Sequence, residues 1–125
     1  MNDRLTFKEE GVWVARPGLV HFTADDIAFL EHEAPLTKKR RARICAHQEG
    51  DRVHQMLIAF CADSVNPMHA HEKMESISVL KGNLLINFNW DNVVLLAGDF
   101  LRIPAHCLHQ PVPMTACVIL ETAEK

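Results

Sequence analysis

The chain has 125 residues, 48% of them hydrophobic, which is enough for one domain with a sizeable core and too little for two. Its formal charge of -3 gives no electrostatic case for nucleic acid as a partner, because proteins that bind nucleic acid usually carry a broad basic excess. No apolar run approaches the roughly 20 residues that span a bilayer, and the N-terminal residues lack a signal-peptide core. These features predict a cytoplasmic protein that works on a small molecule, not on nucleic acid or a membrane.

The first predicted elements are a strand at Val12–Ala15 and a helix from Thr23 to about Glu33. Thr23 is a suitable N-cap, and the two acidic residues that open the helix favour its positive end. One face of this helix carries a narrow apolar stripe, made of Ile27, Leu30 and Ala34. We expect residues 1–38 to form a strand and helix arm packed on, or swapped across, a barrel made by residues 39–125.

Short apolar segments separated by turn residues dominate the rest of the chain. Many short strands of this kind predict a sandwich or a barrel. The segments Lys81-Gly82-Asn83 and Trp90-Asp91-Asn92 are interpreted as hairpin loops, the first using Gly82 for a backbone angle that other residues resist. The predicted strands span residues 41–47, 53–61, 74–81, 83–90, 93–97, 99–103 and 115–122.

Three good metal ligands, His69, His71 and Glu75, lie close together in a segment with strand character. Successive side chains of an extended chain alternate between faces, so these three residues of one parity project to the same side. Ile77 and Val79 share that parity and are expected to form an apolar floor beneath the ligands.

A fourth candidate ligand, His109, follows a second segment that contains Gly98 and Pro104. Three neutral imidazoles and one carboxylate suit one divalent metal ion, and iron, manganese, nickel, copper and zinc all fit this ligand set. Such a site leaves coordination positions free for water or a substrate.

The two segments together resemble the two motifs of the cupin superfamily. The first motif, His-x-His-x3-Glu-x6-Gly, is matched at every defining position from His69 to Gly82, although the glycine that usually precedes it is Asp63 here. The resemblance implies an all-β cupin double-stranded β-helix, that is, a jelly-roll barrel, with an interior that holds a small ligand beside the metal.

The second motif, Gly-x5-Pro-x-Gly-x2-His-x3-Asn, is matched at Gly98, Pro104 and His109. Its middle glycine is His106 in this chain, and its final asparagine is Pro113. These departures concern the geometry of the turn more than the set of ligands.

A narrower resemblance runs from about Arg41 to Ala105. The segments 41–47 and 51–60, followed by 69–76, are similar to the small WbuC-type cupin metalloproteins that are found with bacterial surface-polysaccharide genes. The resemblance implies a bacterial cytoplasmic protein with a mononuclear metal, and it implies no established reaction.

The segment before the metal motif offers candidates for binding a substrate. Arg43, Cys45 and His47 share parity, so one face presents a cation, a thiol and an imidazole. If that face is interior, Arg43 can bind a carboxylate or phosphate and His47 can transfer protons; otherwise both pair with carboxylates at the surface. The basic run Lys38–Arg41 is either a steering patch for an anionic molecule or a solvated strand entrance.

Three functions remain open. The first is an enzyme, a metal-dependent isomerase, epimerase or dioxygenase, acting on a sugar-like or carboxylate substrate; because the chain has no tyrosine, a proton-transfer role falls to His47 or His54. The second is a non-catalytic module that binds or senses a metabolite, and the third is a barrel that the metal merely clamps. In each case we expect a homodimer.

The four cysteines, Cys45, Cys61, Cys107 and Cys117, lack CxxC spacing and lie in apolar segments. A reduced state is therefore predicted in place of a disulfide framework. Cys107 shares parity with His109 and is interpreted as a small buried filler, the alternative being a neighbour of the metal.

Overall fold

The computed structural model describes residues 4–125, which form ten strands, one α-helix and one short 3-10 helix. The helix α1 (Ala24–Glu33) and the 3-10 turn η1 (Ala34–Leu36) separate the first two strands from the others. Over this range no helix combines the length and the apolar character that crossing a bilayer requires. The strands are β1 (Leu5–Glu9), β2 (Val12–Ala15), β3 (Arg41–Cys45), β4 (Val53–Phe60), β5 (Glu75–Lys81), β6 (Leu84–Phe88), β7 (Asp91–Leu95), β8 (Phe100–Ile103), β9 (Gln110–Pro113) and β10 (Cys117–Glu124).

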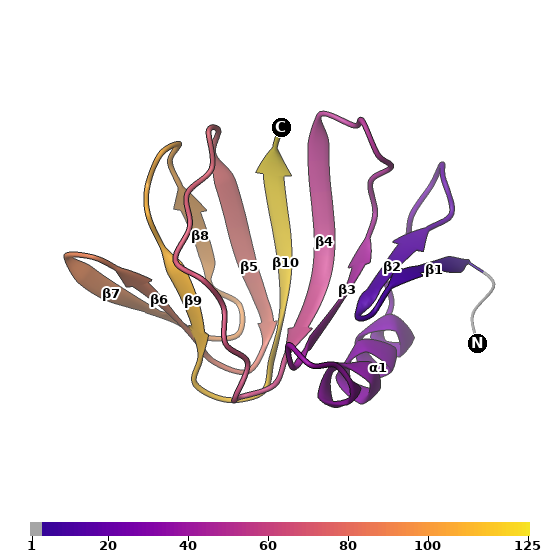
Figure 1. The fold of residues 1–125 in the computed structure, drawn as a ribbon, viewed down its shortest axis with the longest axis horizontal. Coiled ribbons are helices and arrows are strands. Elements are labelled where there is room, and N and C mark those ends of the chain that lie inside the picture. The colour runs from indigo at the N-terminus through magenta and orange to yellow at the C-terminus, as the bar shows by residue number, and fades with distance from the viewer. Residues whose placement is uncertain (1–3) are drawn as a thin grey trace.

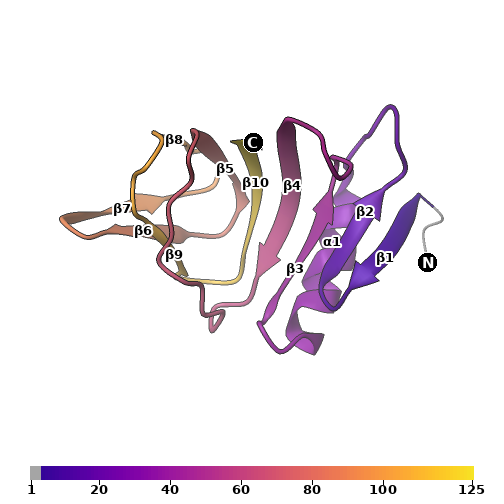
Figure 2. The ribbon, with the colours of Figure 1, turned by 45° about the horizontal axis from the view of Figure 1, so that its top comes forward.

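The strands form two sheets that face each other. The larger sheet has the order β1-β2-β3-β4-β10-β5-β8, and the smaller one has the order β7-β6-β9 (Figure 1). Neighbouring strands are antiparallel except for β2 and β3, which are parallel. Figure 2 shows the smaller sheet curving round to lie opposite β5 and β10. The predicted all-β jelly-roll barrel with a strand and helix extension is therefore confirmed.

The space between the two sheets holds one apolar core. Ile77 and Val79, expected on the inner face of their strand, are 3% and 1% exposed and pack against Leu84 and Ile86 of the smaller sheet. Burying an aliphatic side chain of this size contributes about 1.5–3 kcal/mol each, so this layer holds the sheets together.

A second core lies on the outer face of the larger sheet, under α1 (Figure 2). Leu30 of the helix is fully buried against Ile44 and Leu57 of the sheet. The helix begins after Thr23 as predicted, and the Asp26 carboxylate accepts hydrogen bonds from the Thr23 backbone N–H at 2.8 Å and from its hydroxyl at 3.3 Å. The apolar stripe therefore packs the helix against the larger sheet, and α1 covers the outer face of that sheet.

Two strands were missed by the sequence reading, β1 and β9. β9 contains Pro111 and Pro113, which weaken strand character, but it lies at the edge of its sheet, where proline is tolerated. β1 is also an edge strand, and four of its five residues are exposed, so its apolar pattern is weak.

The expected hairpin at Lys81-Gly82-Asn83 was wrong, since β5 and β6 belong to different sheets. The segment carries the chain from one sheet to the other. Gly82 does adopt the predicted unusual backbone angle, with φ of +79°. The hairpin at Trp90 was confirmed, because β6 and β7 pair directly from Phe88 and Asp91 onward.

Candidate metal centre and adjoining pocket

The four predicted metal ligands come from two segments that the fold brings together. Glu75 is the first residue of β5, and His109 directly precedes β9. His69 and His71 lie in the irregular connection between β4 and β5, which differs from the extended strand that the parity argument assumed. The connection is strand-like only at His69, which forms an isolated antiparallel bridge with His109. The chain therefore delivers the ligands through this bridge and not through one long strand.

Backbone carbonyl groups fix the orientation of two of the imidazole rings. The Nδ1 atom of His69 lies 2.9 Å from the Pro67 carbonyl oxygen, and Nδ1 of His109 lies 2.9 Å from the Cys107 carbonyl oxygen. A carbonyl can only accept, so each Nδ1 carries the proton and donates. Each Nε2 is then left for a ligand, which is the arrangement usual for metal-binding histidines.

The ligand atoms converge on one point. One donor atom from each of the four residues lies within 4.8 Å of all the others, close to the spacing that bonds of about 2 Å to a single ion require. Nε2 of His71 is 3.3 Å from Oε1 of Glu75, and Nε2 of His109 contacts the same oxygen. Glu75 and His109 are almost fully buried, at 1% and 2% exposure.

The buried atoms lack satisfied hydrogen bonds. Among residues 4–125, neither carboxylate oxygen of Glu75 nor Nε2 of His71 has a hydrogen-bond partner of good geometry. A buried polar atom without a partner is costly, and a divalent cation at the centre would satisfy these atoms together. The donor set therefore fits a metal ion.

The ionisation of Glu75 and His109 also favours a cation at this point. Burial raises the pKa of Glu75, but the contacts with His109 and Glu121 outweigh it and hold this pKa below its ordinary value. Burial lowers the pKa of His109, yet the contact with the Glu75 carboxylate and the hydrogen bond with the Cys107 carbonyl raise it overall. Glu75 is therefore an anion that attracts a positive charge, either a proton on His109 or a metal ion in its place.

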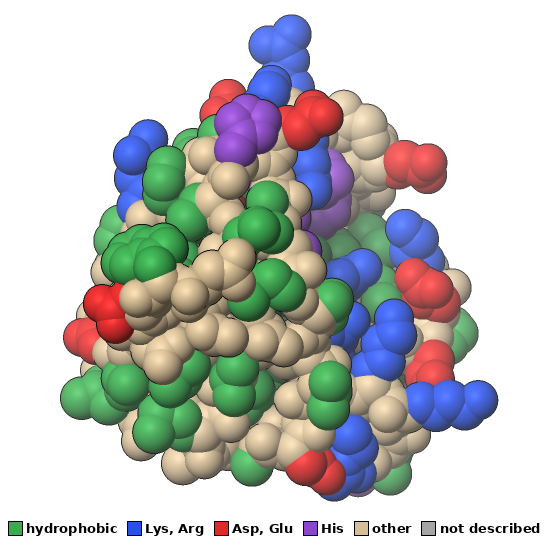
Figure 3. Space-filling model, turned by 60° about the vertical axis from the view of Figure 1, so that its left-hand side comes forward, with side chains coloured by type: hydrophobic (Ala, Val, Ile, Leu, Met, Phe, Trp, Pro, Cys, Tyr) green, Lys and Arg blue, Asp and Glu red, His purple; other side chains and the backbone are tan. Residues whose placement is uncertain are grey.

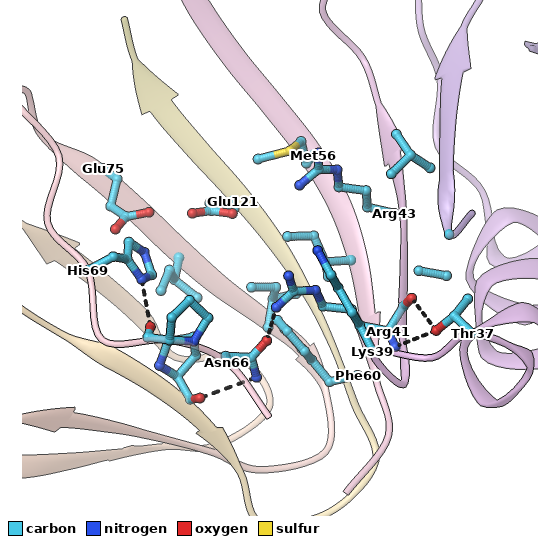
Figure 4. A pocket seen from close by; sticks show the side chains of 18 of the residues that line it. Thr37, Lys39, Arg41, Arg43, Met56, Phe60, Asn66, His69, Glu75 and Glu121 are labelled. Atoms are coloured by element: carbon cyan, nitrogen blue, oxygen red, sulfur yellow. Dashed lines mark hydrogen bonds between the residues drawn. The ribbon is translucent and has the colours of Figure 1, made fainter. Parts of the chain in front are cut away.

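The ligands lie at one end of a cavity of about 550 Å³ inside the barrel. Arg41, Arg43 and Lys39 line the other end, and Glu121 lies between Arg43 and Glu75 in Figure 4. In Figure 3, Lys and Arg side chains border a hollow in the surface, with histidine at its rim. Apolar residues complete the wall between the two ends, among them Met56, Ile58, Phe60, Ile77 and Ile119.

Of the residues predicted to bind substrate or transfer protons, Arg43 lines the cavity, whereas His47 and His54 do not. Arg43 lines the cavity together with Arg41, because Ala42 between them and Ile44 after them pack into the other core. His47 and His54 are not among the cavity-lining residues; their rings stack on each other, with centroids 3.8 Å apart and planes 9° apart. Burial and the neighbouring His54 lower the pKa of His47.

The sequence reading missed Glu121, which lines the cavity from β10. Burial, followed by the neighbouring carboxylate of Glu75, raises the pKa of this carboxyl group. The signal was available, since Glu121 shares parity with the buried Ile119 in a strand that was predicted, and a carboxyl group in an apolar alternation is unusual.

Comparisons with solved structures place the fold. A cupin superfamily protein from Desulfitobacterium hafniense is 21% identical and superposes with a TM-score of 0.64 over 67% of this chain and 76% of its own. A conserved protein of unknown function from Streptococcus pyogenes is 14% identical, with a TM-score of 0.64 over 70% of this chain and 76% of its own. An RmlC-like cupin from Shewanella frigidimarina is 24% identical, with a TM-score of 0.59 over 66% and 73%. These likenesses establish the cupin fold.

Comparison by sequence gives the family. No curated protein matches the chain. Residues 22–97, more than half of the sequence, match the family described as a domain of unknown function, DUF6016. The chain is thus a cupin-fold protein with a His and Glu group suited to a metal ion, and it belongs to the DUF6016 family.

Proposed function

We propose that this protein is a metal-dependent cupin enzyme that acts on a small polar or anionic molecule, sugar-like or carboxylate in character. The observation that carries the proposal is the convergence of three imidazoles and one buried carboxylate at the end of a cavity large enough for a metabolite. When bound, a divalent ion supplies Lewis-acid chemistry or, if it is redox-active, chemistry with dioxygen. Both isomerase or epimerase chemistry and dioxygenase chemistry are compatible with that role.

In this proposal, different residues hold the metal ion and bind the substrate. His69, His71, Glu75 and His109 hold the ion, and Arg43 binds the negatively charged group of the substrate. The wall of the cavity between them is mostly apolar. A proton-transfer role for His47 or His54 would require an opening toward the cavity, which neither residue lines.

A second candidate function is a non-catalytic cupin that captures or senses a metabolite. The position of His47 and His54 outside the cavity favours it, because the two histidines expected to move protons do not face the ligand space. Glu121, a carboxyl group inside the cavity, favours the enzyme instead.

The resemblance to WbuC-type proteins supports a role in bacterial polysaccharide metabolism. The four cysteines are unpaired, which supports a reducing, cytoplasmic compartment. A binding screen of nucleotide sugars and small organic acids against the metal-loaded protein tests the polysaccharide role; it fails if only organic acids bind.

Elemental analysis after anaerobic purification tests the metal site. We expect about one divalent ion per chain in the wild type and loss of most of it in His69→Ala, His71→Ala and His109→Ala. His32→Ala is the matched control, since this exposed histidine on α1 pairs with Glu33 at 3.0 Å, remote from the site. Equal metal content in the wild type and in a His69→Ala/His71→Ala double variant would refute the assignment.

A further inference from the structure

The strand β3 presents two guanidinium groups to the cavity. Arg41 and Arg43 alternate with Ala42 and Ile44, which are buried on the opposite face of the sheet. Burial and the nearby Arg43 both lower the pKa of Arg41, as expected for two cations held close together away from water. Within residues 4–125, neither guanidinium forms a salt bridge, and the buried Nε of Arg43 has no hydrogen-bond partner. Within the described residues, the pair is attracted electrostatically to the carboxyl group of Glu121 but has no anion in direct contact.

Arg41 is held in place by the segments that carry the metal ligands. Its guanidinium donates to Oδ1 of Asn66, a buried side chain whose Nδ2 donates to the Pro111 carbonyl at 3.3 Å (Figure 4). The Asn66 carbonyl in turn accepts from Nε2 of Gln110 at 2.8 Å. Asn66 precedes His69 by three residues, and Gln110 follows His109 directly. The orientation of Arg41 is therefore fixed relative to the metal centre, and most of its five N–H donors remain for a ligand.

Two strands separate the arginine pair from Glu75. The order of the sheet is β3-β4-β10-β5, so the backbones of β3 and β5 are three intervals apart, about 14 Å at about 4.8 Å for each interval. Side chains extend into this interval from both ends. Between them the wall is formed by Ile58 of β4 and Ile119 of β10, with Glu121 as the one acidic group on that stretch of β10 facing the cavity. The middle of the cavity is mostly apolar and thus suits a short carbon chain.

We propose that the cavity binds an acid with two heads: a neighbouring pair of oxygens at the metal, and a terminal carboxylate or phosphate between Arg41 and Arg43. The inference rests on the proposed metal site and specifies the substrate class for it. A planar guanidinium matches both carboxylate and phosphate through two parallel hydrogen bonds, and two guanidiniums together compensate the charge of either group. The apolar wall covers the chain that joins the two heads.

Calorimetric titration of the protein loaded with Mn²⁺ tests the two-headed ligand. The probes are 2-oxoglutarate, which has both heads and ends in a carboxylate, and 3-phosphoglycerate, which has both heads and ends in a phosphate. Pyruvate supplies the oxygen pair alone, and glutarate supplies two carboxylates without the neighbouring oxygen. We expect at least one two-headed probe to bind about tenfold or more tightly than pyruvate and glutarate, and which one does so distinguishes carboxylate from phosphate.

Variants of the two arginines test where the terminal carboxylate or phosphate binds. Arg41→Ala and Arg43→Ala should each weaken the preferred two-headed probe about tenfold or more, while metal content and pyruvate affinity stay at wild-type levels. Arg43→Lys keeps the charge but loses the planar fork, so it should fall between. Arg102→Gln is the matched control, because this exposed arginine lies on β8 opposite Ser76 and does not line the cavity.

The outcomes separate this inference from the function on which it rests. If the wild type retains Mn²⁺ but binds pyruvate or glutarate as tightly as the two-headed probes, or if Arg41→Ala and Arg43→Ala have no effect, the two-headed ligand is refuted and the metal site stands. If the wild type binds no metal, the proposed function itself fails.

Discussion

The backbones of His69 and His109 are joined by two reciprocal hydrogen bonds: the N–H of each residue donates to the carbonyl oxygen of the other, both at 2.9 Å. A third bond, from the His106 N–H to the His71 carbonyl at 2.8 Å, ties the same two segments together. These main-chain bonds hold together the two segments that carry three of the four ligand residues. The fold thus preorganises the candidate metal site.

Removing the metal should therefore leave the fold intact and lower its stability. A ligand that binds only the folded state stabilises it by about 2.7 kcal/mol when present at 100 times its dissociation constant. Circular dichroism of chelator-treated protein should show an unchanged β-sheet spectrum and a lower Tm, which added metal restores. A His69→Ala/His71→Ala variant should show no such restoration. Loss of the sheet spectrum on chelation would mean that the ion organises the site.

Glu75→Gln should weaken metal binding, because the substitution removes the one negative charge among the four ligands while keeping their shape. We expect a rise in the metal dissociation constant of about tenfold or more, measured by competition with a chromophoric chelator. Glu121→Gln is the comparison, because it changes a neighbouring carboxyl group that is not one of the four ligands. Wild-type metal affinity in Glu75→Gln with loss of activity would show that Glu75 is a catalytic base instead.

The convergence of the four candidate metal ligands could be predicted from sequence because their spacing matches a motif, but the parity argument for it was only partly right. Parity correctly placed Ile77 and Val79 inside the barrel, where β5 is regular. It does not apply to His69 and His71, since the chain between β4 and β5 is irregular and a backbone bridge positions it. Local pattern describes strands well and says little about the connections between them.

The residues predicted to bind substrate show the same limit of sequence patterns. The face of β3 that carries Arg43 is interior, but one sequence could not decide this, because neither face of the strand is simply solvent-exposed: one lines the cavity and the other is covered by α1. His47 shares parity with Arg43, yet it lies beyond the end of β3, where the alternation stops. The turn at His106 explains one motif departure: its φ of +63° is the left-handed conformation that a glycine usually supplies.

Gly82→Ala should destabilise the protein by about 3 kcal/mol, from the left-handed backbone and the overpacking together. A Cβ atom at Gly82 would lie 2.2 Å from the Ala116 carbonyl oxygen, and φ there is +79°. Gly50→Ala is the matched control: φ is +91° but nothing lies within 4 Å, so only the backbone cost of about 1–2 kcal/mol applies. Urea denaturation measures both. Equal losses would show that the close approach of β10 does not matter.

Cys117 should resist alkylation in the folded protein. Burial raises the pKa of its thiol from 9.0 to about 11, and the thiolate is the reactive form. At pH 9, iodoacetamide should label Cys117 only after unfolding in urea, as read by peptide mass spectrometry. Because the unfolded thiol loses its proton first, this group favours the folded state below pH 9, and that contribution is lost as the pH rises from about 9 to 11. Rapid labelling of the folded chain would contradict its burial.

A homodimer is expected because both edge strands of the larger sheet carry an exposed aromatic side chain. Phe7 on β1 is 61% exposed and Phe100 on β8 is 63% exposed. An open edge with an apolar side chain is a common site of pairing between copies. Light scattering should give twice the chain mass of 14.2 kDa. Phe7→Ser and Phe100→Ser, tested separately, show which edge pairs; a monomer at every concentration would disprove the dimer.

The position of β3 in the larger sheet, where it pairs in parallel with β2, has a consequence for how the sequence of such a protein can change during evolution. β3 is inserted between the N-terminal strands and the barrel, and it carries Arg41 and Arg43, while the metal ligands lie across the sheet next to β5 and β9. Under the proposed function, substitutions on β3 alter the residues that bind the substrate and leave the four candidate metal ligands unchanged. The residues for specificity and those for reactivity then lie on separate strands, and selection can alter one set while preserving the other.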